Sequence, residues 1–155
     1  MKSTIIIAIF LFAGTDFVQS QNNAALIGSW TATSKTAKIY FLADGKGYQT
    51  IMKSNPIHDI YICNAELIMP FNWYNIKDTI FIKWDTTHFS VNPDLVPTTS
   101  QTLSGNPLKA LTEGCAIAGQ MTLAETRKRI PVKTKNRFTI EGNMLNYGSS
   151  YTRDE

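Results

Sequence analysis

The sequence contains few of the residues from which catalytic and metal centres are built. Its two histidines, His58 and His88, lie far apart, and neither has the spacing of a metal ligand or stands in a known nucleophile motif. The carboxylates are scattered along the chain, so the sequence places no two of them across a cleft. We therefore expect no catalytic residue, no metal site and no cofactor, and the sequence does not indicate an enzyme.

Charge is also scarce. Only 17% of the residues are charged, and 15 Lys and Arg against 12 Asp and Glu leave a net charge of +3, which argues against a dedicated nucleic-acid binder. With 43% hydrophobic residues the chain is too apolar to be disordered, and 155 residues suit a single core. We expect one domain over residues 21–155.

The N-terminal segment contains an unbroken apolar run, but this run is too short to span a membrane. Lys2 precedes the apolar segment Ile5–Phe12, and Val18-Gln19-Ser20 resembles a cleavage site. We expect residues 1–20 to be a cleavable signal peptide rather than a retained anchor. No cysteine lies near the cut, which disfavours lipid attachment, so the predicted location is secreted or periplasmic.

Cysteine is rare, with Cys63 and Cys115 as the two examples. Their spacing matches no zinc pattern, and an exported protein can keep a disulfide. A single Cys63–Cys115 bridge is one interpretation, and two buried unpaired cysteines are the alternative.

The dominant pattern is alternation with a period of two, interrupted by turn residues. Ile39, Phe41 and Tyr48 are expected to share an inward face in the first of three hairpins. The hairpins span 37–52 with a turn at Asp44–Gly47, 69–84 with a turn at Asn75–Asp78, and 138–147 with a turn at Glu141–Asn143. Short strands joined in this way indicate an all-β sandwich or barrel.

Residues 92–130 differ from this pattern. Pro93, Pro97 and Pro107 predict an irregular connection over 92–107. Apolar residues at helical spacing then predict one helix from Leu108 towards Met121. We expect this insertion to be a lid, a docking surface or a mobile loop.

Several short motifs carry a family resemblance. Gly28-Ser29-Trp30, Asp44-Gly45, Phe71-Asn72-Trp73 and Tyr151-Thr152-Arg153 resemble a bacterial lipocalin-like domain, a calycin-type small secreted barrel, over residues 26–91 and 136–153. The resemblance implies a mainly all-β fold, an antiparallel up-and-down β-barrel of about eight strands with one loop or helix insertion.

The resemblance also implies structural roles for Gly28, Trp30 and Arg153. In that family the tryptophan closes one end of the barrel and an arginine of the last strand lies across it, a cation over an indole face. The alternative is that Arg153 is a frayed C-terminal charge beside Asp154 and Glu155.

Barrels of this size either fill with side chains or hold one small ligand. We expect binding of a small apolar or amphipathic molecule, with an aromatic wall of candidate lining residues: Tyr48, Phe71, Trp73, Ile82 and Trp84. The alternative is a packed structural or interaction barrel that contacts an envelope component or partner protein through its surface.

One charged feature stands out. Basic residues occupy odd positions on a segment predicted to be extended: Arg127, Arg129, Lys133, Lys135 and Arg137. The stripe they predict is either a solvated strand face that discourages edge pairing or a docking surface for an anionic polysaccharide or lipid surface. No nucleic-acid partner is expected, and the sequence does not indicate an oligomeric state.

Overall fold

The computed structural model describes residues 23–155, so the predicted signal peptide lies outside the described residues. The described chain forms one long helix, one short 3₁₀ segment η1 (Thr86–His88) and ten strands. The strands are β1 (Gly28–Ala32), β2 (Ala37–Phe41), β3 (Lys46–His58), β4 (Tyr61–Ile76), β5 (Thr79–Trp84), β6 (Ser90–Pro97), β7 (Lys133–Arg137), β8 (Thr139–Glu141), β9 (Met144–Tyr147) and β10 (Ser149–Arg153). Helix α1 (Gly105–Arg129) connects β6 to β7.

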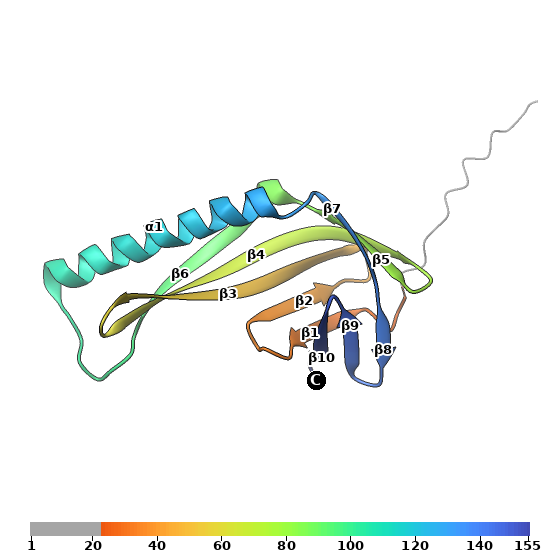
Figure 1. Cartoon of the computed structure of the whole chain (residues 1–155), viewed down its shortest axis with the longest axis horizontal. Helices are drawn as coiled ribbons and strands as arrows, with labels where there is room; N and C mark the ends of the chain where they lie inside the picture. Colours follow the sequence, from red (N-terminus) through yellow and green to blue (C-terminus); the bar gives the residue numbers. More distant parts are fainter. Residues whose placement is uncertain (1–22) are drawn as a thin grey trace, which may run out of the picture.

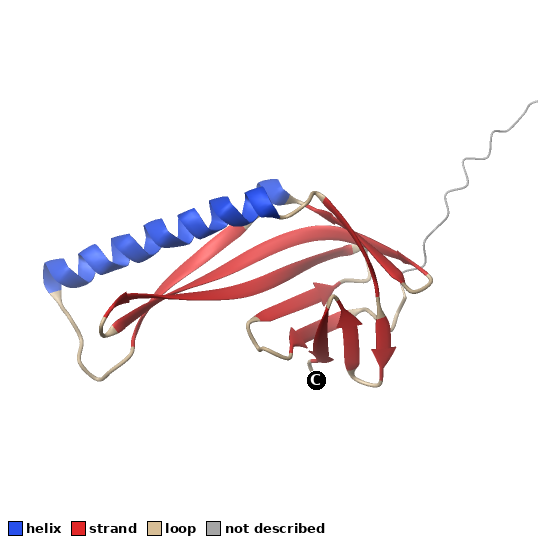
Figure 2. Ribbon diagram, viewed as in Figure 1, coloured by secondary structure: helices blue, strands red, loops and turns tan. Residues whose placement is uncertain are grey.

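The strands form a nearly closed antiparallel barrel, which confirms the predicted fold class of a mainly β protein with one helical insertion. The sheet order is β7-β5-β4-β3-β2-β1-β10-β9-β8, and β6 pairs with the N-terminal half of β4, residues 61–68. Figure 1 and Figure 2 show that β3, β4 and β6 extend well beyond the barrel and that α1 lies along this extension.

The core follows from the alternation in β4 and β5. Phe71 and Trp73 of β4 point inward together with Ile82 of β5, as the period-two pattern predicts, and each is at most 3% exposed. The turn between these strands is tight because Lys77 adopts a left-handed backbone conformation (φ 54°). Alternate residues of both strands thereby reach one continuous apolar core.

Trp30 closes one end of the barrel. Its side chain is fully buried, and its indole N–H donates to the Leu26 carbonyl at 2.9 Å. The Arg153 guanidinium lies 4.5 Å from the ring centroid and also donates to the Ala25 carbonyl. Arg153 is therefore held over the indole face rather than frayed, in the arrangement that the resemblance implies.

The last residues of the chain fasten the first strand. The Asp154 carboxylate accepts hydrogen bonds from Thr31 at 2.5 Å and Ser29 at 2.8 Å, and it pairs with Lys38 at 3.2 Å. These contacts, led by the Thr31 hydroxyl, lower the pKa of Asp154. Strands β1, β2 and β10 are thus joined by side chains as well as by their backbone ladders.

The prediction for Tyr48 is wrong, because the register of the first hairpin places it on the outer face. The turn pairs Phe41 with Gly47 and Tyr40 with Tyr48, whose rings stack at 4.2 Å. Gly47 takes the inward position since a Cβ there would lie 2.4 Å from the Phe71 ring. The missing side chain at position 47 makes room for Phe71.

The irregular connection expected over 92–107 is wrong at both ends, because residues 105–107 already belong to the first turn of α1 and only residues 98–104 are irregular. Residues Ser90–Pro97 form strand β6, although they include Pro93 and Pro97. The prolines are tolerated because β6 pairs only with β4 and is an edge strand, where a missing N–H breaks no second ladder.

The basic stripe is also divided. Arg127 and Arg129 belong to the last turn of α1, where cations favour the helix dipole, while Lys133, Lys135 and Arg137 lie on β7. The helix continues for eight residues past Met121, the last residue of the predicted helical spacing. The first part of the basic stripe is therefore helical, with 3.6 residues per turn, and the second part is extended, with side chains that alternate every second residue, so the five residues do not share one face.

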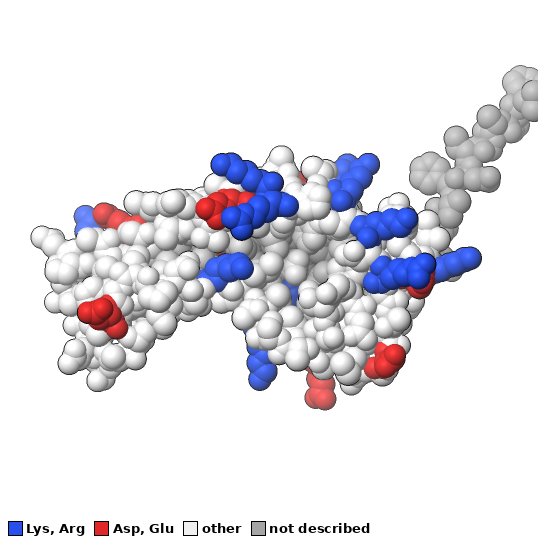
Figure 3. Space-filling model, viewed as in Figure 1, with Lys and Arg blue, Asp and Glu red and all other residues white. Residues whose placement is uncertain are grey.

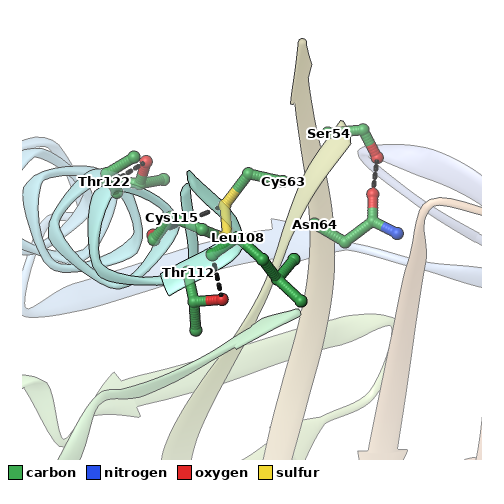
Figure 4. Close-up of a disulfide and its surroundings, with 8 residues drawn as sticks. Ser54, Cys63, Asn64, Leu108, Thr112, Cys115 and Thr122 are labelled. Carbon is green, nitrogen blue, oxygen red and sulfur yellow. Dashed lines mark hydrogen bonds between the residues drawn. A yellow bond between two sulfur atoms is a disulfide. The ribbon is translucent and has the colours of Figure 1, made fainter. Parts of the chain in front are cut away.

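Cys63 and Cys115 form a disulfide with a Cα–Cα distance of 5.4 Å, which resolves the choice left open by the sequence. Figure 4 shows the bridge joining β4 to the middle of α1. Gly119, one turn further along the helix, allows a close approach because a Cβ there would lie 3.3 Å from Pro93 of β6. The helix is thus fixed to the inner face of the extension.

We predict that Arg153→Ala lowers the free energy of unfolding by about 1 to 2 kcal/mol, since it removes the cation over Trp30 and the hydrogen bond to Ala25. Urea denaturation followed by tryptophan fluorescence measures the change. Arg129→Ala, at a site where the side chain is 81% exposed, is the matched control with an expected loss below about 0.5 kcal/mol. Equal losses in the two variants would contradict a specific role for Arg153.

We predict that Cys63→Ala/Cys115→Ala lowers the free energy of unfolding by about 4 kcal/mol, because the bridge closes a loop of 52 residues. Mass spectrometry should show a gain of two hydrogens when the wild-type protein is reduced. Amide exchange should become faster in α1 than in β1 or β10. An unchanged mass on reduction, or equal stability of the double variant, would refute the bridge.

Candidate functional site

The predicted aromatic lining fills the closed half of the barrel. Phe41 contacts Trp73 edge-on at 4.9 Å, and Phe71 contacts Trp84 at 5.1 Å. The Trp73 N–H donates to the Lys46 carbonyl at 2.9 Å. Phe71, Trp73, Ile82 and Trp84 are each at most 8% exposed, so they pack as core and form no wall of an open pocket inside the barrel.

Two cavities that are open to solvent lie at the opposite end of the barrel, and both are lined by Ile51 of β3. The larger cavity, of about 620 Å³, lies at the tips of the β1–β2 and β9–β10 hairpins. The second, of about 410 Å³, lies between α1 and the inner face of β3 and β4. We call these two neighbouring cavities the mouth site, and the volume of either one suits a small ligand.

The floor of the mouth site is apolar. Ile51 and Leu67 face each other across the β3–β4 ladder, and Ile130 closes the cavity at the end of the helix. Thr122 and Thr126 supply the helical wall, and their hydroxyls donate to helix carbonyls at 2.9 and 2.8 Å. Since these hydroxyl protons are engaged within the helix, the wall is less polar than its residue types suggest.

The rim beside the helix is charged. Arg129 pairs with Glu125 of the same helix at 3.7 Å. Lys53, on the inner face of β3, has no ion pair among residues 23–155. This leaves a single unpaired ammonium at the edge of an apolar floor, an arrangement that favours the anionic end of an amphiphile.

Two tyrosines of the last hairpin line or flank the other cavity. Burial raises the pKa of Tyr151, with the neighbouring Tyr147 as a second cause and a hydrogen bond with Gln49 acting in the opposite direction. Burial likewise raises the pKa of Tyr147, against hydrogen bonds with Thr134 and Asn136 of β7. Both phenols are neutral at neutral pH, and Tyr147 links β9 to β7 where the barrel is not closed by a ladder.

The roof of the mouth site is held at three points. The disulfide anchors the middle of α1, and Gly119 brings it close to Pro93 and Val91 of β6. Near the C-terminal end of the helix, the Arg127 guanidinium donates to the Phe89 carbonyl at 2.6 Å. Arg127 therefore acts as a structural clamp, a role that the basic stripe did not predict.

Other polar clusters offer little chemistry. His88 lies 2.7 Å from Asp85, and the pKa of Asp85 is lowered first by the Thr87 hydroxyl and then by His88. The His88 side chain is 76% exposed and lines neither cavity of the mouth site. Within residues 23–155 no group of three or more histidine, cysteine or acidic residues is placed to hold a metal ion.

The sequence does not predict Gln49, Ile51 and Lys53 as lining residues, because an inward Tyr48 turns these alternate positions outward. The available signal was Gly47, whose lack of a side chain opposite Phe71 moves the inward set by one residue. The helical wall could not be located from the sequence, since it depends on where α1 crosses the sheet.

None of the helices in the described part of the chain is long and apolar enough to cross a membrane. Comparison with known proteins adds no assignment: no protein-family model matches the chain, and no curated protein matches it significantly.

Proposed function

We propose that this protein binds one small amphipathic molecule in the mouth site, as a lipocalin-like exported binding protein rather than an enzyme. The observation that carries the proposal is that two cavities of the described chain, both lined by Ile51, lie at the end of the barrel opposite Trp30. The opposite end is filled by Trp30, Phe41 and Trp73, so a ligand would enter from the mouth.

The chemistry of the mouth site favours an acyl chain with an anionic head. The chain would lie on the partly exposed side chains of Ile51 and Ile130, beneath the threonines of the helix. The carboxylate or sulfonate would lie at the rim near Lys53, whose charge is not compensated within the described residues. Fatty acids and similar single-chain anions have this combination of groups.

The family and the location belong to the same proposal. The nearly closed antiparallel barrel and the contact of Arg153 with Trp30 support a lipocalin-like identity. The apolar segment of the leader and the cleavage pattern that ends at Ser20 support export to the periplasm or the outside, and the Cys63–Cys115 disulfide suits such an oxidising compartment.

A packed interaction barrel is the second candidate. It is supported by the filled closed half and by two apolar side chains on the outward side of α1, Ile117 at 62% and Met121 at 63% exposed. Under this candidate the surface of the helix, rather than the mouth site, would contact a partner protein.

We predict that dodecanoate binds the wild-type protein and that Thr126→Trp weakens binding at least about tenfold, because the indole occupies the cavity beneath the helix. Isothermal titration calorimetry measures the affinity. Thr112→Trp is the matched control, since Thr112 makes the same hydroxyl contact with a helix carbonyl (Figure 4) but lies outside both cavities. We expect the control to retain the wild-type affinity.

The head group is tested separately. Lys53→Gln should weaken binding of dodecanoate more than binding of uncharged dodecanol, whereas Lys109→Gln, on an exposed turn of α1, should change neither. An absence of dodecanoate binding, or equal binding by Thr126→Trp and wild type, would exclude the mouth site and favour the interaction barrel.

A further inference from the structure

A third cavity, of about 410 Å³, lies on the outer face of the sheet, where β4, β5 and β7 run side by side. It is separate from the mouth site, because residues of β4 that point outward alternate with those that fill the core. The strand registers place two rows of side chains across these three strands. We call the space between the rows the outer trough.

The first row is aromatic. Tyr74 pairs with Phe81 across β4 and β5, and their rings stack in parallel with centroids 4.8 Å apart and planes 6° apart. Lys135 follows on β7 and places its ammonium 5.7 Å from the Phe81 centroid. Since the ring faces are turned towards neighbouring strands, the rings present their edges to the trough, and aromatic edges carry partial positive charge.

The second row is polar and cationic. Register pairs Asn72 with Lys83 and Lys83 with Lys133, so that these three side chains lie in line across the same strands. Adjacent strands are about 4.8 Å apart, which sets a similar spacing along the row. The row provides two ammonium groups and one amide directly opposite the aromatic row.

The charge of the outer trough is of one sign. Its lining includes Lys83, Lys133 and Lys135 and no carboxylate, and none of these lysines has an ion pair among residues 23–155. Figure 3 shows Lys and Arg side chains gathered at the right of the molecule, over the region where β5 and β7 lie in Figure 1. A concave surface lined by one sign of charge concentrates anions of the opposite sign.

The shape of the outer trough favours some classes of polyanion over others. A single-stranded nucleic acid stacks successive bases on several exposed aromatic faces, but both faces of Phe81 are covered, by Tyr74 and by Lys135, which leaves at most the outer face of Tyr74 in this row. A bilayer surface is too flat to enter a cavity between two side-chain rows. An extended chain of saccharide rings fits better, since its C–H groups can pack on the carbon-rich walls while its acidic groups reach the lysines.

We propose that the outer trough binds an anionic glycan, a chain of sugar rings that carries sulfate or carboxylate groups. The chain would run across β4, β5 and β7, with its acidic groups on Lys83 and Lys133 and its rings along the Tyr74–Phe81 row. Of the predicted basic stripe, Lys133 and Lys135 belong to this proposed binding site, whereas Arg127 and Arg129 do not. Arg137 lies one row away and is paired with Asp78 at 3.9 Å.

The test uses a heparin hexasaccharide as the acidic probe and maltohexaose as its neutral counterpart, with binding measured by calorimetry on the full mature protein. Wild type should bind the acidic probe, more weakly as salt increases, and should not bind the neutral one. Lys83→Gln/Lys133→Gln should lose about tenfold in affinity, as expected when two partly screened charge contacts are removed. Phe81→Leu, which keeps apolar volume but removes the ring, should also weaken binding.

The matched control is Lys35→Gln/Lys109→Gln, which makes the same change in net charge at two exposed sites far from the trough. It should retain wild-type affinity, and all variants should melt at the wild-type temperature. Equal losses in both double variants would reduce the effect to net charge and overturn the proposal. It would be overturned as well if the hexasaccharide does not bind, or if phosphatidylglycerol vesicles or an oligothymidylate bind in its place. Dodecanoate binding at the mouth site is an independent measurement and should be unaffected by Lys83→Gln/Lys133→Gln.

Discussion

The uninterrupted alternation of β4 is the constraint on which the rest of the structure depends. This 16-residue strand pairs with β3 along most of its length, with β5 at one end and with β6 at the other. Any slip by one residue would move Trp73 outward and Tyr74 inward, and it would take Cys63 away from Cys115. The barrel, the extension and the attachment of the helix therefore share a single register.

The size of the inward residues along β4 divides the molecule into a filled half and a hollow half. Phe71 and Trp73, together with the tryptophan plug at Trp30, occupy the barrel as completely as a packed core requires. In the first half of the strand the inward set includes the small residues Cys63 and Ala65, and α1 packs over this part of β4. The mouth site falls beside Ile51, which pairs with the fully buried Leu67 and is itself only partly buried.

The sequence predicts what depends on local pattern. The inward residues of the second hairpin, the mainly β class and the existence of a helix over residues 108–121, though not its ends, follow from periodicity and turn residues. The orientation of Tyr48 does not follow from local pattern, because a turn that is longer or shorter by one residue exchanges the inward and outward side chains of the following strand. The register of this strand is set by the tight contact between Gly47 and Phe71. Strand β6 is not predicted because proline is typical of loops and is tolerated in strands only at an edge. The mouth site and the outer trough are not predicted because each is built from elements that are distant in sequence.

The two candidate sites use opposite faces of one sheet, and this bears on whether they can communicate. Coupling requires an element with two arrangements whose equilibrium both ligands bias. The strands between the sites carry the packed core around Phe71 and Trp73, and the helix over the mouth is tied by the disulfide and by Arg127. None of these supplies such an element, so the free energies of binding at the mouth site and the outer trough should add independently, as for separated sites on a rigid scaffold.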